Sequence, residues 1–96
     1  MKFSIKKNEN ILSLTRRLGY AARGTEGEEF NCVRILGGNG YPRFHLYIKQ
    51  EKDNIFFNLH LDQKKPSYQG NPAHSGEYEG ELVEQEKERI MKALEE

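Results

Sequence analysis

Residues 43–62, "RFHLYIKQEKDNIFFNLHLD", decide the fold of this 96-residue chain. Apolar residues stand at every second position from 44 to 48 and again from 55 to 61. A period of two is typical of strands with one buried and one exposed face. The polar residues between the two runs are a short turn, so the stretch predicts two antiparallel strands, 43–49 and 54–62.

The polar residues of these two strands share one face of the sheet, because pairing brings the apolar residues together on the other. A turn at residues 52–53 places His45 opposite His60, whereas a turn at residues 53–54 places His45 opposite Asp62. Directly opposed Cβ atoms lie about 4.5–5.5 Å apart. Either register therefore gathers the same residues on what we call the polar face: Arg43, His45, Tyr47, Lys49, Phe56, Asn58, His60 and Asp62.

Upstream of this pair, "FNCVRIL" (30–36) predicts a third strand. Its apolar residues fall on both faces, which indicates a strand covered on both sides or one that carries a bulge. The intervening "GGNGYP" contains Asn39-Gly40, a strong hairpin signal. "FSI" (3–5) is a candidate fourth strand, and the polar "ARGTEGEE" (22–29) is interpreted as a connection.

Two helices complete the prediction. One spans about residues 10–18, with Asn8 or Asn10 as its N-cap and Gly19 just beyond its end. The other follows Gly80, and its buried stripe is predicted to contain Leu82, Val83, Ile90 and Leu94. The expected fold is one α+β domain over residues 1–96, ordered (β)-α-β-β-β-α. Its three- or four-stranded antiparallel sheet has both helices on one face.

Charge distribution, cysteine content and apolar runs limit the classes of protein to which this sequence can belong. Formal net charge is zero, but residues 1–50 carry nine Lys or Arg against four Glu, and the other residues carry six bases against eleven acids. This asymmetry indicates either a basic surface on the N-terminal half or an acidic C-terminal helix lying over that half. With a single cysteine, no signal peptide and no long apolar run, the sequence predicts a cytoplasmic protein that does not enter membranes.

The polar face and the long connection 63–79 are the expected working surface. Outward aromatic rings beside basic residues are typical of sheets that stack single-stranded bases. We therefore expect a binding module for nucleic acid or another phosphate-bearing ligand, needing no cofactor. Its candidate binding residues are Arg43, His45, Tyr47, Lys49, Phe56, His60, Lys64 and Lys65.

A zinc-dependent hydrolase is the alternative. His60 and Asp62 lie on one strand face, about 6.5–7 Å apart along the backbone, which lets both side chains reach one ion. The candidate metal ligands are His45, His60, Asp62, His74 and Glu77. The same two strand histidines could also act as a metal-free acid and base, and a third interpretation is a protein–protein adaptor or homodimer that uses the same face.

Two resemblances accompany this interpretation. The order helix, three strands, helix is similar to that of the double-stranded RNA-binding domain, but "EGELVEQE" stands where that family has a basic cluster, so we do not assign the chain to it. The segments "HLDQKKPSY" (60–68) and "AHSGEY" (73–78) resemble segments of small uncharacterised bacterial proteins. That resemblance implies a small free-standing protein and assigns no activity to any residue.

Overall fold

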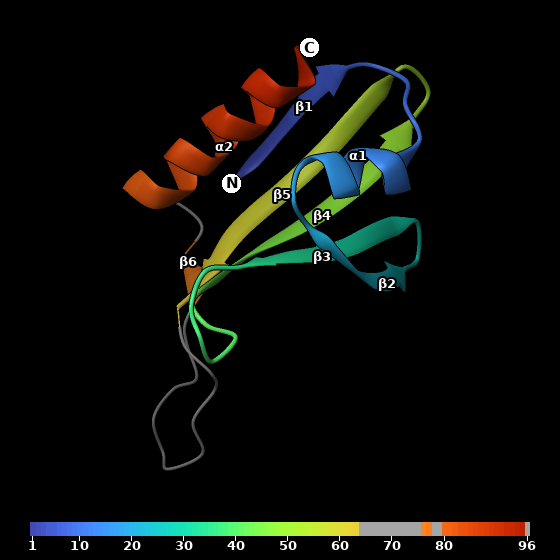
Figure 1. Ribbon diagram of the computed structural model, residues 1–96. Helices are drawn as coiled ribbons and strands as arrows, with labels where there is room; N and C mark the ends of the chain where they lie inside the picture. The colour runs from blue at the N-terminus through green and yellow to red at the C-terminus, as the bar shows by residue number, and fades with distance from the viewer. Residues whose placement is uncertain (64–75, 78–79, 96) are drawn as a thin grey trace.

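The structure is a computed structural model that describes residues 1–63, 76–77 and 80–95 (Figure 1). Its strands are β1 (Lys2–Lys6), β2 (Ala21–Glu26), β3 (Glu29–Ile35), β4 (Arg43–Glu51), β5 (Asn54–Asp62) and β6 (Gly76–Glu77). Its helices are α1 (Ile11–Arg17) and α2 (Glu81–Leu94). The predicted α+β class with an antiparallel sheet is confirmed.

All strands belong to one antiparallel sheet with the order β1-β5-β4-β3-β2, and β6 pairs with the outer part of β5. Strands β2 to β5 form a meander through short connections. Helix α1 carries the chain from β1 at one edge to β2 at the opposite edge (Figure 1).

The strand count of three or four was too low. β1 forms as predicted, but β2 falls in the segment that we interpreted as a connection, and β6 falls in the long connection 63–79. All six residues of β2 are exposed, so this strand has no alternation of apolar and polar residues to reveal it. Pairing with β3, around a Gly27-Glu28 turn in which Gly27 has φ +63°, forms it instead.

The β4–β5 hairpin has the first of the two registers considered. Lys52 and Asp53 form the turn, since Glu51 pairs with Asn54, and His45 therefore lies directly opposite His60. The β3–β4 connection is also a hairpin, but it spans residues 36–42. Its turn is closed by a 3.4 Å bond from Gly40 N to Gly37 O.

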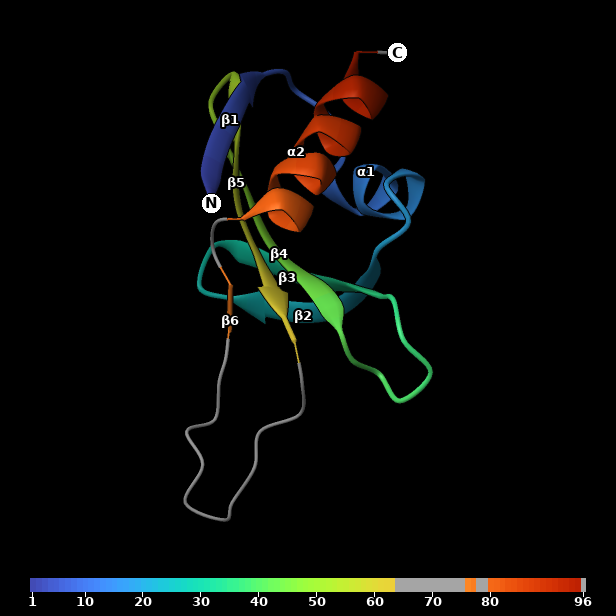
Figure 2. The same cartoon turned by 90° about the vertical axis from the view of Figure 1, so that its left-hand side faces the viewer.

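The core lies between the sheet and the two helices, which pack on the same face of the sheet (Figures 1 and 2). It is built from the predicted apolar faces of β4 and β5 and the apolar side of each helix. Its fully buried large side chains include Leu14, Leu18, Leu46, Ile48, Ile55, Leu59, Leu61, Val83 and Ile90. At about 25 cal/mol per Å² of apolar area, this burial is the main force that holds the helices to the sheet.

Helix ends follow the predicted signals. The side chain of Asn10 accepts a 2.9 Å hydrogen bond from Ser13 N, and Gly19 follows α1 with φ +88°.

Leu82, expected on the buried stripe of α2, is instead 51% exposed. The buried stripe begins at Val83 and includes Glu86, whose carboxylate was not expected in the core.

Glu86, on the acidic helix α2, contacts a basic residue from the N-terminal half of the chain. It accepts hydrogen bonds from Tyr20 Oη and from Arg89 Nε at 2.8 Å, and Arg34 Nη1 lies 3.3 Å from it. Arg89 also donates to the carbonyl of Leu18 at 2.7 Å. Glu86 thus pairs both with Arg89 of its own helix and with Arg34 of the basic half, and which of the two predicted arrangements holds for the other charges stays a prediction.

Candidate polar-face site

The polar face of the sheet is the face opposite the helices, and its residues form a grid. Across β4 and β5, Arg43 pairs with Asp62, His45 with His60, Tyr47 with Asn58, and Lys49 with Phe56. Strand β1 extends two of these rows, since Lys2 pairs with Asn58 and Ser4 with Phe56. Strand β3 adds Asn31 beside Tyr47 and Val33 beside His45.

At one end of this face, two imidazoles and one carboxylate converge. His60 Nε2 lies 3.1 Å from Asp62 Oδ1, and His45 Nδ1 lies 3.5 Å from Asp62 Oδ2. Arg43 Nε donates to the same Oδ2 at 3.3 Å, and the amide oxygen of Asn31 lies at hydrogen-bond distance from His45 Nε2. Nitrogen atoms of both imidazoles and oxygen atoms of the carboxylate therefore lie close together at this end of the polar face.

Burial makes both histidines weaker bases than usual. Desolvation lowers the pKa of His45 below its ordinary 6.5, and the neighbouring His60 lowers it further. Desolvation also lowers the pKa of His60, although the Asp62 carboxylate acts in the opposite direction. Both imidazoles are therefore harder to protonate than an exposed histidine side chain.

Aromatic rings continue the site along the sheet. His45 stacks on Tyr47 with ring centroids 4.7 Å apart, and it also lies 4.9 Å from the His60 ring. Arg43 lies over the Tyr41 ring at 4.6 Å. These contacts fix the Tyr47 ring next to the imidazoles.

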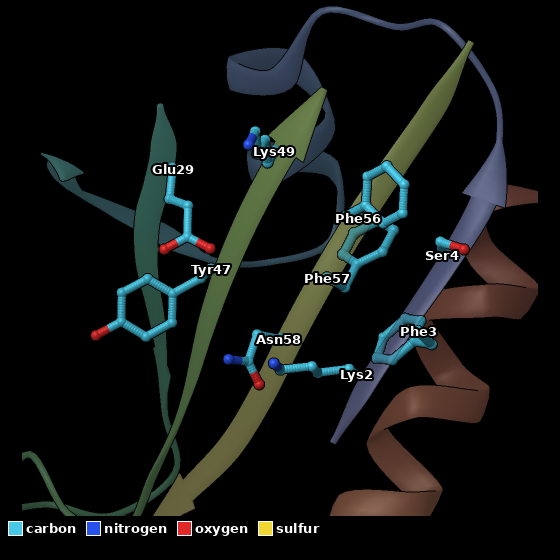
Figure 3. A pocket seen from close by; sticks show the side chains of 9 residues that line it. All are labelled: Lys2, Phe3, Ser4, Glu29, Tyr47, Lys49, Phe56, Phe57 and Asn58. Carbon is cyan, nitrogen blue, oxygen red and sulfur yellow. The ribbon is translucent and has the colours of Figure 1, made fainter. Parts of the chain in front are cut away.

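A groove of about 420 Å³ lies next to these rings (Figure 3). It is lined by Lys2, Phe3, Ser4, Glu29, Tyr47, Lys49, Phe56, Phe57 and Asn58. Phe56 is 41% exposed although its neighbours on the same strand, Ile55 and Phe57, are buried. Tyr47 and Phe56 are diagonal neighbours across β4 and β5, with Asn58 and Lys49 at the other two corners (Figure 3).

The ammonium group of Lys49, at one side of the groove, forms ion pairs only with exposed carboxylates. Lys49 Nζ lies 3.2 Å from Glu51 and 3.5 Å from Glu28, but these carboxylates are 56% and 81% exposed. Ion pairs between exposed groups are weak because water screens them, so an incoming anion can replace them. Lys2 and Lys6 are exposed on β1 and point to the same face.

The structure brings together six of the predicted binding residues: Arg43, His45, Tyr47, Lys49, Phe56 and His60. Lys64, Lys65 and His74 lie outside the described residues. Glu77 pairs with Leu61 and Gly76 with Asp62 in the register of β6, while the side chain of Glu77 also lies outside the described part. Cys32 is buried, as expected of a small apolar residue, and burial raises the pKa of its thiol to about 12.

Sequence reasoning missed the contributions of the two strands that flank β4 and β5. Asn31 reaches His45 from β3, and Lys2 and Ser4 reach the groove from β1. The alternation of Lys2, Ser4 and Lys6 with apolar Phe3 and Ile5 was the available signal. It gave the face of each side chain but not the position of β1 beside β5.

Comparison with known proteins adds no assignment. No protein-family model matches the sequence, and no curated protein or solved structure is significantly similar to it. Neither helix in the described part of the chain is long and apolar enough to span a membrane. A functional argument therefore depends on the geometry of the polar face.

Proposed function

We propose that this protein is a binding module for single-stranded nucleic acid, and that the polar face of its sheet is the binding surface. The observation that carries the proposal is the pair of rings, Tyr47 and Phe56, placed diagonally beside a groove on a face that neither α1 nor α2 covers. The rings, the lysines and the Asn58 amide of the groove each have a counterpart in the chemistry of an unpaired nucleotide, whereas the Glu29 carboxylate in the same lining does not.

The rings supply stacking. A diagonal pair on an antiparallel sheet has Cα atoms about 7–8 Å apart, which leaves each ring able to stack on a base. Such stacking is worth about 1–3 kcal/mol per base and tolerates any sequence, because every base has a flat face. An exposed phenylalanine at position 56 contributes nothing to the core, so a ligand that covers it gives it a role.

Lysines supply the contacts to phosphate. Lys49 and Lys2 line the groove on opposite sides of the β5 strand, and Lys6 extends the row on β1. The exposed carboxylates that pair with Lys49 are weak competitors for a phosphate group. The Asn58 amide, at a corner of the grid next to both rings, offers both a donor and an acceptor to the edge of a base.

Binding of a labelled oligothymidylate, followed by fluorescence anisotropy, tests the proposal. Affinity should fall steeply between about 50 and 200 mM salt, because each phosphate contact releases a counterion. Phe56→Ala and Tyr47→Ala should each weaken binding about tenfold, the loss of roughly one stacked base. Leu82→Ala is the matched control, since it removes another exposed apolar side chain from helix α2 and should leave affinity unchanged.

Affinity that is absent or independent of salt would overturn the proposal. If the Phe56 variant instead changes the mass of the protein in solution, the same ring belongs to an interface between two copies. Circular dichroism of each variant confirms that its fold is intact before the affinities are compared.

A further inference from the structure

The three groups that converge at the end of the polar face have the composition of a metal site. His45, His60 and Asp62 each offer one ligand atom, and these atoms lie within 4.8 Å of one another. Both histidines project from paired positions of the β4–β5 hairpin, and Asp62 follows His60 on the same strand face. The hairpin, and not a long side-chain network, sets their relative positions.

Each histidine lies at a distance from Asp62 that suits two ligands of one small ion. Two ligands of a tetrahedral zinc ion lie about 3.3 Å apart, because each bond to the metal is about 2.0–2.2 Å long. Asp62 Oδ1 lies 3.1 Å from His60 Nε2, and Asp62 Oδ2 lies 3.5 Å from His45 Nδ1. We propose that His45, His60 and Asp62 bind one divalent transition-metal ion, of which zinc is the representative.

The outer contacts of these groups support that assignment. A histidine that binds metal through one nitrogen commonly donates its other N–H to an oxygen. The Asn31 oxygen lies at hydrogen-bond distance from Nε2 of His45, a partner that suits a histidine binding metal through Nδ1, the nitrogen that faces Asp62. Arg43 donates to Oδ2 of Asp62 and so orients the carboxylate.

An ion from solvent can reach the three proposed ligand side chains. The side chains of His45, His60 and Asp62 are 15%, 11% and 21% exposed, which is enough for entry of an ion.

Three protein ligands leave one tetrahedral position for water or for an oxygen of a ligand. That position lies near the proposed nucleic-acid groove, because Tyr47 both stacks on His45 and lines the groove. The metal site does not depend on the groove, however, and each can be tested in the absence of the other.

The first test is a titration of the metal-free full-length protein with zinc chloride. Calorimetry should give one equivalent per chain, and NMR should show the imidazole nitrogens of His45 and His60 shifting together and saturating at that equivalent. Histidine resonances that ignore zinc, or that shift only gradually over many equivalents, would overturn the assignment. This measurement needs no variant, so a folding defect cannot obscure it.

Two variants then identify the ligands. Asp62→Asn keeps the shape of the side chain but removes its charge, and it should weaken zinc binding by about tenfold or more. Asp53→Asn, the same substitution in the exposed turn at the other end of the hairpin, should bind zinc as the natural protein does. Equal affinities for the two variants would show that zinc binds elsewhere.

Oligonucleotide binding measured with and without a chelator separates this inference from the proposed function. Zinc binding with no nucleic-acid affinity supports the metal site and overturns the groove. Nucleic-acid affinity with no zinc binding does the reverse.

Discussion

The carboxylate of Glu86 is only 3% exposed, and three side chains surround it: Tyr20, which directly precedes β2, Arg34 of β3 and Arg89 of α2. Replacing Glu86 by Ala leaves two arginines without their partner. Breaking a buried ion pair costs about 3–5 kcal/mol, and because both arginines are about a third exposed we expect about 2–3 kcal/mol. Urea unfolding of the Glu86→Ala variant measures this loss.

Glu84 and Glu88 flank this position on the solvent side of α2. Substitution of either by Ala should change the free energy of unfolding by no more than about 0.5 kcal/mol. A similar loss in all three variants would mean that helix propensity, and not the buried network, determines the effect.

Tyr20 makes the stability of the folded protein depend on pH in the alkaline range. Its hydroxyl is buried and lies beside the Glu86 carboxylate, so its pKa is raised well above the ordinary 10.0. The folded state therefore keeps a proton that the unfolded state releases. Stability is complete below pH 10.0, and the free energy of unfolding falls by about 1.4 kcal/mol per pH unit as the pH rises through that value.

Tyr20→Phe removes this titration and the hydrogen bond with it. The variant should be about 1 kcal/mol less stable at neutral pH, but its stability should fall less steeply above pH 10. Urea unfolding of both proteins at a series of alkaline pH values provides the comparison. Parallel slopes would contradict the assignment, since Cys32, whose raised pKa adds a similar dependence, is present in both proteins.

Among the elements, the β2–β3 hairpin depends on one glycine. Gly27 has φ +63° in the turn, whereas Gly38, in the next connection, has an ordinary φ and no atom within 4 Å of the place of a Cβ. Gly27→Ala should cost about 1 kcal/mol, the price of a left-handed conformation for an L-residue. Gly38→Ala should be nearly neutral, and thermal unfolding of the two variants compares them directly.

The same hairpin shows where sequence information ends. Elements with a regular alternation or a helical stripe were predicted within a few residues, including β4, β5 and both helices. β2 was missed because it is an exposed edge strand, and its existence depends on hydrogen bonds to β3 and not on burial. Leu82 was misplaced because the stripe of α2 passes through Glu86, a residue that hydrophobic periodicity does not select.

The candidate site was predictable to the same extent. Alternation alone placed His45, His60 and Asp62 on one face, because a residue's face depends only on its position within its own strand. Asn31 and Lys2 could not be assigned to the site in this way. Their places depend on which strands are neighbours in the sheet, and that follows from packing of distant segments.

At the scale of the whole molecule, three lysines and the acidic helix lie on different faces of the sheet. Lys2, Lys6 and Lys49 belong to the polar face, and helix α2, which carries several exposed glutamates, packs on the opposite face (Figure 2). Neutralising Lys2 and Lys6 with Gln should weaken oligonucleotide binding and reduce its salt dependence by about one to two counterions. Glu84→Gln with Glu88→Gln, the matched pair on α2, should leave the salt dependence unchanged. An equal response to both pairs would mean that only net charge attracts the nucleic acid.

The crossing of the sheet by α1 has a consequence for how the chain reaches this fold. Phe3 pairs with Phe57, so β1 is synthesised long before β5, the strand on which it depends. Closing so long a loop costs entropy that only later contacts offset, which slows such pairing. We expect the locally connected meander to form first and β1 and α2 to dock onto its finished edge. A nascent chain on the ribosome would accordingly not complete its fold until almost all of the sequence has emerged.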